Sequence, residues 1–419
     1  MERRHRKLSL SESDKKFLQD EGESGLKPLV SDMDSNYIIN FNKTNSWMNV
    51  ARNFKYALSN LFNSDFKHFF LIQDCKLYIL GKEFSCRPPL KSVYRQAKKE
   101  LKDIIWVTYR TQFRPIPAKT RESAWQTDSG WGCTIRVGQM LFLNTLRRHF
   151  SLPREETYKI LKTIEENLEK APFSIHKIVE TSSNEPGEWF SPCGISHVLV
   201  DLLKNFPISK FQMYVCMDNL ICIDQIIALS TDRSLDAVRD FCCCLEESEE
   251  NICVNCQKPI HDIKWKNSVL LFLPIMLGRE KIMKEYVKVL EYFMKTEFFV
   301  GAIGGKPKSA LYLVGIKENS VIVLDPHYVQ TANKTFLNFK QNIHTYYCEK
   351  FISIPVSSLE SSLNIGIFIQ SKEDLQVFIA DLKTNPSIEG FISVKSRTPD
   401  YLLEDSVVYT ENEDGFIVF

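Results

Sequence analysis

The hydrophobic positions change their spacing about half-way along the 419 residues of the chain. In the first half, apolar side chains recur every three or four residues, which places them on one face of a helix. This spacing predicts helices over residues 92–113, 133–149, 154–170 and 196–205. In the second half, short apolar runs bounded by polar turns predict strands. These strands are expected over residues 211–217, 269–274, 298–303, 310–316, 321–324 and 364–370, with helices over 280–295 and 371–382.

Early helices followed by strands are typical of an α+β fold, here with a helical N-terminal part and an antiparallel or mixed sheet. A further strand and turn are predicted over residues 72–85, and a strand or short helix over 219–230. Residues 1–40 are charged and rich in serine, which predicts a disordered N-terminal tail. Residues 41–385 then form one domain with a small inserted region at about 232–263, and residues 386–419 form a C-terminal tail.

The end of that tail combines acidic residues with an apolar terminus over 411–419. Taken alone, this composition is typical of a tail without a binding role.

Composition excludes several classes of protein. The chain has 53 basic and 52 acidic residues, so no overall charge favours nucleic acid or a membrane surface. No apolar run is long enough to span a bilayer, and polar residues follow the basic N-terminus, so no signal peptide is expected. We therefore expect a cytoplasmic protein with no nucleic-acid partner.

The 12 cysteines are spread over a long chain, which is not typical of a disulfide framework. One cluster stands out: Cys242, Cys243 and Cys244, followed by Cys253, Cys256 and His261. The spacing of Cys253 and Cys256 fits a zinc ribbon, but the rest of the cluster is irregular and surrounds an acidic run. An acidic insertion without metal is the better interpretation, and the sequence predicts neither a metal nor a cofactor.

The chemistry is concentrated around Cys133, which lies in a glycine-flanked turn just before the helix predicted over residues 133–149. A thiol at a helix N-terminus is close to unpaired N–H groups and the positive end of the helix dipole, which favour the reactive thiolate. The alternative is a buried structural cysteine. A pair far along the chain, Asp325 and His327, favours the reactive form. At the end of a strand these two residues point to the same side.

A carboxylate beside an imidazole fixes its tautomer and supports an imidazolium. An early cysteine with a distant histidine is the arrangement of papain-like cysteine proteases. Taken alone, the Asp-Pro-His sequence would instead indicate a simple turn.

Several motifs together resemble those of the autophagins, the autophagy-related cysteine endopeptidases. The matching segments follow the order of that family, from about residue 78 to about residue 369. They are residues 78–82, 106–110, 128–133 with 136–140, 189–192, 217–219, 273–278, 304–307 and 325–327. Departures from the family pattern occur at Thr134, Ser191 and Leu311. The resemblance implies a papain-like cysteine protease fold.

The same resemblance implies a role for each matching residue. Cys133 would be the nucleophile, His327 the general base and acid, and Asp325 the residue that orients His327. The hydroxyl of Tyr109, at the end of the helix predicted over 92–113, would help to form the oxyanion hole. Trp189 and the loop around Pro307 would cover the cysteine until substrate displaces them. The family often has an acidic and then aromatic tail that adds a strand to the sheet of its substrate, so the resemblance gives residues 411–419 this role as an alternative to a tail without a binding role.

The implied function is that of a cysteine endopeptidase which cleaves ubiquitin-like autophagy modifiers after a C-terminal glycine. It would also release such modifiers from phosphatidylethanolamine, and so meet the membrane surface only through a lipidated substrate. Other readings are a papain-like protease acting on ubiquitin or another modifier, and a modifier-binding protein without catalytic activity. A fourth hypothesis is a zinc-stabilised module in residues 242–261.

Overall fold

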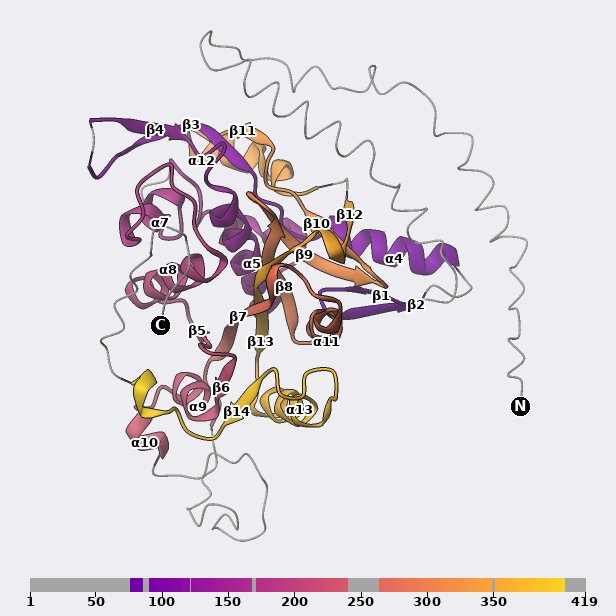
Figure 1. The fold of residues 1–419 in the computed structure, drawn as a ribbon. Helices are drawn as coiled ribbons and strands as arrows, with labels where there is room; N and C mark the ends of the chain where they lie inside the picture. The colour runs from indigo at the N-terminus through magenta and orange to yellow at the C-terminus, as the bar shows by residue number, and fades with distance from the viewer. Residues whose placement is uncertain are drawn as a thin grey trace. The chain divides into compact units, whose positions relative to one another are not determined.

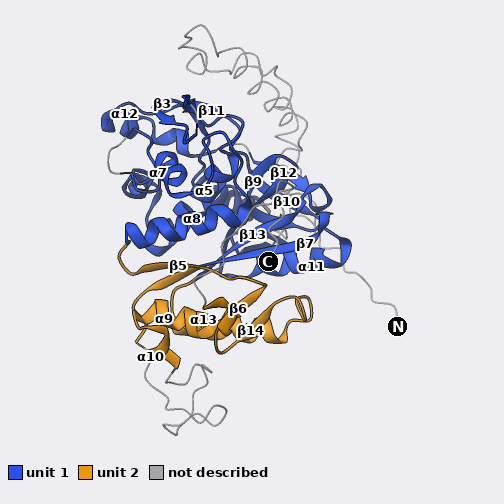
Figure 2. Cartoon of the chain, turned by 60° about the vertical axis from the view of Figure 1, so that its left-hand side comes forward, with its two compact units in different colours: residues 1–207, 271–368 blue, residues 208–270, 369–419 orange. Residues whose placement is uncertain are grey.

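The computed structural model describes residues 76–85, 90–120, 122–167, 171–239, 264–348 and 351–403. The chain divides into two compact units (Figure 2). Unit 1 contains residues 1–207 and 271–368, and unit 2 contains residues 208–270 and 369–419. The tail predicted over residues 1–40, most of the predicted insertion (240–263) and the end of the chain (404–419) lie outside the described residues. The domain boundaries drawn from the sequence stay a prediction.

A large sheet runs through unit 1 in the order β12-β10-β9-β8-β13-β7 (Figure 1). Its strands are β7 (Ser268–Lys281), β8 (Phe299–Lys306), β9 (Ser309–Lys317), β10 (Ser320–Leu324), β12 (Ile352–Pro355) and β13 (Glu360–Ile369). The pairs β8–β9, β9–β10, β10–β12 and β8–β13 are antiparallel. A hairpin of β1 (Lys76–Ile79) and β2 (Lys82–Ser85) joins through β1 to β9. Most of the strands predicted from apolar runs are therefore present.

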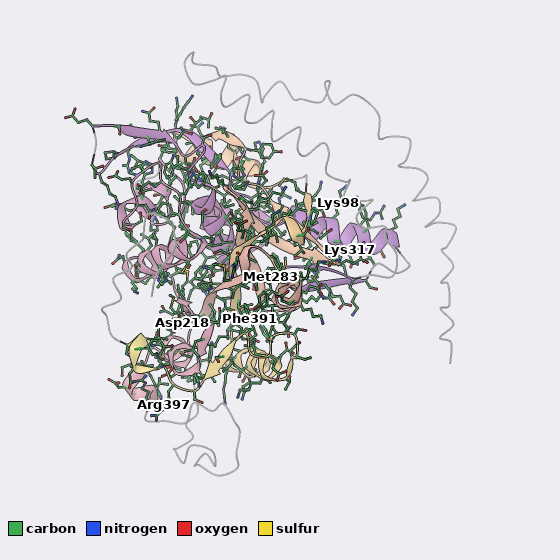
Figure 3. The ribbon with its side chains drawn as sticks, in the orientation of Figure 1. Lys98, Asp218, Met283, Lys317, Phe391 and Arg397 are labelled. Atoms are coloured by element: carbon green, nitrogen blue, oxygen red, sulfur yellow. The ribbon has the colours of Figure 1, made fainter. Side chains whose placement is uncertain are left out.

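Helices cover this sheet because its central strands are apolar throughout. Every residue of β8 except Lys306 is buried. A strand buried on both faces reads as a continuous apolar run rather than an alternating one. Both α5 (Cys133–His149) and α11 (Val287–Lys295) contact β8 and β9. Side chains fill the space between the helices and the sheet, and even Lys317, at the end of β9, is buried (Figure 3).

The central helix α5 has the bounds predicted from the sequence. Its first 14 residues, from Cys133 to Leu146, are all buried, as expected of a helix in the interior of a protein. It packs against α6 (Tyr158–Leu161) and α8 (Pro192–Asn205), and α7 (Ile175–Thr181) packs on α8. Helix α8 begins four residues before its predicted start, because Ser191 caps it through Gly194 N–H (2.9 Å) and Pro192 occupies the first turn.

A second sheet, in the order β11-β3-β4, corrects one prediction from the sequence. It consists of β3 (Tyr109–Pro117), β4 (Ala124–Thr127) and β11 (Val329–Thr331). The helix predicted over residues 92–113 is therefore too long. In the structure α4 (Leu90–Lys102) ends before it, and Tyr109 begins a strand. The intervening residues are largely β-branched or aromatic, which favours extended backbone.

The helix predicted over residues 154–170 is also wrong. Only a short 3₁₀ turn (Arg154–Glu156) and the four residues of α6 are helical there. The reason lies in Glu165 and Glu166, which are buried instead of forming the polar face of an amphipathic helix. The helix predicted over 280–295 starts later, with a 3₁₀ turn at Lys284–Tyr286 before α11, because β7 extends to Lys281. The structure adds α12 (Phe336–Gln341) and 3₁₀ turns at Ile343–Tyr346 and Val356–Ser358.

Unit 2 is smaller and contains no candidate catalytic residue. Its elements are β5 (Phe211–Val215), β6 (Leu220–Cys222), α9 (Ile223–Thr231), α10 (Leu235–Arg239), α13 (Lys372–Thr384), β14 (Ser393–Lys395) and a 3₁₀ turn (Asp400–Leu402). The predicted strand or short helix over 219–230 is both, first β6 and then α9. The parallel pair β6–β14 lies within the unit. The buried carboxylate of Asp224 accepts hydrogen bonds from Thr398 N–H (2.8 Å) and Thr398 Oγ1 (2.7 Å).

Candidate active site

The thiol of Cys133 lies at the first residue of α5, immediately after Gly132. The turn before it is closed by the backbone carbonyl of Asp128, which accepts the N–H groups of Trp131 (3.2 Å) and Gly132 (2.9 Å). The side chain of Cys133 is only 5% exposed. The positive end of the helix dipole therefore acts on this thiol in an environment with little water.

His327 and Asp325 follow directly after β10, as the strand-end interpretation predicted. The Nδ1 atom of His327 is 2.5 Å from Oδ1 of Asp325, which also accepts the backbone N–H of His327 (2.9 Å). The indole N–H of Trp106 donates to the backbone carbonyl of Asp325 (2.7 Å). These contacts direct the Nδ1–H toward the carboxylate and leave Nε2 for a second partner.

That second partner is Cys133, which forms a side-chain hydrogen bond with His327. Burial disfavours the charged forms of both Cys133 and His327, but the charge on each group stabilises the opposite charge on the other. Although burial raises the pKa of Cys133, the hydrogen bond and positive charge of His327 bring it below its usual value. Although burial lowers the pKa of His327, Asp325 and Cys133 raise it to about 9. The environment of the pair therefore favours a thiolate on Cys133 beside an imidazolium on His327.

Tyr109 reaches the same point from β3. Its N–H donates to the carbonyl of Pro326 (2.9 Å), and β3 pairs in parallel with β11, where Tyr109 lies opposite Val329. The ring of Tyr109 packs edge-on against His327, with ring centroids 5.4 Å apart. Its side chain hydrogen-bonds Cys133. The sheet β11-β3-β4 thus holds a phenol hydroxyl beside the thiol.

Trp189 and the hairpin turn that contains Pro307 lie close together. The indole N–H of Trp189 donates to the carbonyl of Gly130 (2.9 Å), three residues before Cys133, while its ring is 48% exposed. Pro307 and Lys308 form the two-residue turn between β8 and β9, and Lys308 has φ of +60°. The ammonium of Lys308 lies 5.9 Å from the centre of the Trp189 ring.

The hairpin also contributes two contacts that the sequence did not reveal. The hydroxyl of Ser309 is 3.5 Å from Nε2 of His327, and the backbone of Ala310 hydrogen-bonds Cys133. The two residues lie two and three positions after the segment 304–307 that resembles the autophagins, and this closeness in sequence was the only available signal. The beginning of β9 thus touches both partners of the thiolate–imidazolium pair.

Comparison with known proteins identifies the family of this arrangement. The sequence profile of the peptidase C54 catalytic domain matches residues 94–381. The chain belongs to the peptidase C54 family. This assignment confirms the predicted papain-like α+β fold, and it makes the protein an autophagy-related cysteine protease, a thiol hydrolase.

Relatives named as cysteine proteases support the assignment to the peptidase C54 family. Cysteine protease ATG4A of Xenopus laevis is 28% identical over 72% of this chain and 76% of its own length. The human cysteine protease ATG4A is 28% identical over 71% and 76%, respectively. The probable cysteine protease ATG4 of Vanderwaltozyma polyspora is 27% identical over 73% and 75%. The resemblance to the autophagins seen in the motifs is confirmed.

The ion pair predicts the pH dependence of Cys133 reactivity in this peptidase C54 protein. Alkylation by iodoacetamide is expected to be fast already well below the pH at which ordinary thiols react, because the pKa of Cys133 is lowered. Substrate turnover is expected to fall as pH rises through about 9, because His327, the expected general acid, then loses its proton. Rates measured from pH 5 to 10 test both limbs. An alkylation midpoint near that of a free thiol, about 8.5, would contradict the ion pair.

No group of three or more histidine, cysteine or acidic side chains that could hold a metal occurs among the described residues. The cysteines 242–244, 253 and 256, with His261, fall in residues 240–263, outside the part of the chain that is described. The zinc-module alternative is therefore untested. No described helix is both long and apolar enough to cross a membrane.

Proposed function

We propose that this protease cleaves the C-terminal extension of a ubiquitin-like autophagy modifier after a glycine, and also cleaves the amide between that glycine and phosphatidylethanolamine. The observation that carries the proposal is the assembly of Cys133, His327, Asp325 and Tyr109 next to Trp189 and the turn at Pro307. The names of the relatives, cysteine protease ATG4A and ATG4, support a substrate from autophagy.

In the first half of the reaction, the thiolate of Cys133 attacks the glycine carbonyl carbon and forms a C–S bond. The negative charge moves to the carbonyl oxygen, where the N–H of Cys133 and the hydroxyl of Tyr109 would stabilise it. The imidazolium of His327 then donates its proton to the leaving nitrogen. The C–N bond breaks, and a thioester remains on Cys133.

In the second half, neutral His327 takes one proton from water, whose oxygen attacks the thioester carbon. The C–S bond breaks and releases the thiolate and the glycine carboxyl group, which loses the second proton to solvent. The carboxylate of Asp325 keeps the Nδ1–H tautomer in place throughout. The leaving amine is a peptide nitrogen in the precursor and an ethanolamine nitrogen in the lipid conjugate. The same residues therefore act on both substrates, and the protease contacts the membrane only through the lipid conjugate.

Trp189 and the turn at Pro307 would gate the site in this scheme. The Trp189 loop is tied to the nucleophile turn at Gly130, and the hairpin reaches Cys133 through Ala310. The modifier's C-terminal peptide segment, which enters beneath Trp189 and Pro307, must be narrow at the residue next to the scissile bond. This is the physical reason to expect glycine there.

The test is cleavage of a purified modifier that carries a C-terminal extension, by the wild type and by Cys133→Ala. We expect complete loss of cleavage in Cys133→Ala. The matched control, Cys193→Ala, is expected to retain activity, because Cys193 is a half-buried thiol on α8 whose pKa burial raises to about 11. The modifier conjugated to phosphatidylethanolamine on liposomes is assayed in parallel.

Three results would contradict parts of the proposal. Cleavage of extended ubiquitin but not of the modifier would favour a different substrate. Equal cleavage after a bulky residue in place of the glycine would exclude the narrow entry. No reaction of Cys133 with an electrophilic modifier probe would favour a binding protein without catalysis.

A further inference from the structure

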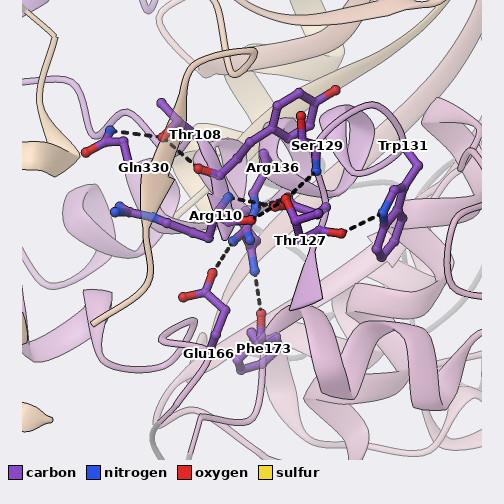
Figure 4. Close-up of polar contacts among 12 residues, drawn as sticks. Thr108, Arg110, Thr127, Ser129, Trp131, Arg136, Glu166, Phe173 and Gln330 are labelled. Atoms are coloured by element: carbon purple, nitrogen blue, oxygen red, sulfur yellow. Dashed lines mark hydrogen bonds and ion pairs between the residues drawn. The ribbon is translucent and has the colours of Figure 1, made fainter. Parts of the chain in front are cut away.

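The carboxylate of Asp128 joins two segments that carry different proposed catalytic groups. Figure 4 shows three of its neighbours, Arg110, Arg136 and Glu166. Its Oδ1 accepts the backbone N–H of Arg110 (2.6 Å), the residue after Tyr109. Its Oδ2 accepts Nε–H of Arg136 (2.6 Å), which lies three residues after Cys133 on α5. Neither Asp128 nor Arg136 is exposed to solvent. One side chain thus connects the strand of Tyr109 to the helix of Cys133.

The backbone of Asp128 strengthens this connection. Its carbonyl closes the turn ahead of Cys133, and its N–H donates to the carbonyl of Arg110 (3.3 Å). A Cβ atom on Gly132 would lie 2.6 Å from Oδ2 and 2.7 Å from Cβ of Asp128. Any side chain at position 132 would therefore displace the carboxylate. The glycine directly before the nucleophile allows this close approach.

Arg136 in turn holds Asp128 from the opposite side. Its Nη1 is 2.5 Å from Oε1 of Glu166 and 3.1 Å from Oε1 of Gln139, and Gln139 donates to the carbonyl of Phe173 (2.9 Å). The aspartate, the arginine and the glutamate are all buried. Charge-assisted hydrogen bonds of this kind have narrow geometry, so the carboxylate of Asp128 has little freedom to move.

Stability alone does not account for such a network. Buried ion pairs are often no more stabilising than apolar side chains of similar volume. Position, in contrast, is critical in catalysis, because a misplacement of about 1 Å can lower a rate by about 100-fold. The two oxyanion donors proposed above, Tyr109 and the N–H of Cys133, lie on the two segments that Asp128 joins.

We propose that Asp128 is a positioning residue that sets Tyr109 relative to Cys133 for stabilisation of the oxyanion, with Arg136 and Glu166 holding its carboxylate in place. The inference rests on the proposed roles of Cys133 and Tyr109. It does not involve His327, whose hydrogen bonds to Asp325 and Cys133 are separate from this network.

The test compares Asp128→Asn with Tyr109→Phe and with the double variant. Asparagine keeps an acceptor for Arg110 N–H but loses the charge that binds Arg136. We expect kcat for modifier cleavage to fall by about 10- to 100-fold with KM nearly unchanged. Alkylation of Cys133 by iodoacetamide, and its pH midpoint, should stay within about twofold of the wild type, since alkylation needs no oxyanion hole. In the Tyr109→Phe background the same change should cost much less, because both variants remove one interaction.

The matched control is Asp224→Asn in unit 2, another fully buried aspartate paired with an arginine (Arg239 Nε, 3.2 Å). It is expected to lower the melting temperature but to leave kcat per folded molecule unchanged. Should Asp128→Asn fail to fold, Arg136→Lys replaces it, with a smaller loss of kcat and the same unchanged alkylation.

Three outcomes would overturn the inference: an unchanged kcat, a parallel fall in alkylation, or additive effects in the double variant. If the wild type itself does not cleave the modifier, the proposed function fails instead.

Discussion

Replacement of His327 by alanine is expected to lower kcat for modifier cleavage by about 10⁵- to 10⁶-fold, comparable to the loss of a triad histidine in serine proteases. Burial raises the pKa of Cys133, and His327 contributes most to lowering it, with smaller contributions from Ala310 and Tyr109. The variant therefore loses the main group that favours the thiolate, as well as the proposed proton donor for the leaving amine. The same substitution should move the pH midpoint of Cys133 alkylation upward, above that of an exposed thiol.

The control for this experiment is His344→Ala. The imidazole of His344 is exposed, and its Nδ1 lies 3.2 Å from the carbonyl of Gln341. The backbone carbonyl of His344, which alanine retains, accepts the N–H of Tyr347 (3.2 Å), so turnover and alkylation should match the wild type. An alkylation profile of His327→Ala that coincides with that of the wild type would show that His327 does not ionise Cys133. The ion pair would then have to be abandoned, even if turnover were lost.

Part of the fold could be predicted because local and global preferences agree. The helix that starts at Cys133 follows a glycine-rich turn and has apolar residues at helical spacing, and the structure begins and ends α5 as predicted. The strands β8, β9 and β10 are apolar runs separated by short turns. Where the hydrophobic pattern is continuous and the residues at its ends favour the same boundaries, tertiary packing preserves the predicted element.

The errors occur where tertiary contacts decide. Tyr109 begins a strand because β3 pairs with β11, which lies more than 200 residues further along the chain. No local pattern contains that partner. Likewise, Glu165 and Glu166 look like the polar face of a helix, but they turn inward to meet Tyr346, Asn333 and Arg136.

The candidate site, like the fold, could be predicted from the sequence only in part. Asp325 and His327 are two residues apart, so their association follows from strand geometry. Their meeting with Cys133, nearly 200 residues away, could be expected only from the resemblance to a family. The contact between Asp128 and Arg136 lies within one motif, whereas Glu166 completes the network from a segment that the sequence assigned to a helix surface.

Replacement of Arg136 by methionine is expected to lower the free energy of unfolding by about 3–5 kcal/mol at pH 8, because it leaves the buried carboxylate of Asp128 without its cation and that of Glu166 with only the positive charge of Arg110. Asp128 and Glu166 lose their ion pairs with Arg136 (2.6 and 2.5 Å), next to Glu165. Burial and then the charge of Glu166 already raise the pKa of Glu165 to about 7, and the cation of Arg136 opposes the effect of burial on the pKa of Glu166.

The loss in Arg136→Met should depend on pH in a defined direction. Burial already raises the pKa of Asp128 in the presence of Arg136. Without Arg136, the pKa values of Asp128 and Glu166 in the folded protein both lie above those of the unfolded chain. The contribution of these carboxyls to folding stability is then most favourable below their pKa values in the unfolded chain, near 4. It is lost as pH rises through their pKa values in the folded protein. Urea unfolding at pH 5.5 and pH 8 should therefore give a smaller deficit at pH 5.5. The control is Lys82→Met, which removes an exposed ion pair with Glu100 (2.8 Å) and should change stability little at either pH. A deficit for Arg136→Met as small as that of Lys82→Met, or equal at both pH values, would mean that the network carries no net buried charge for Arg136 to balance.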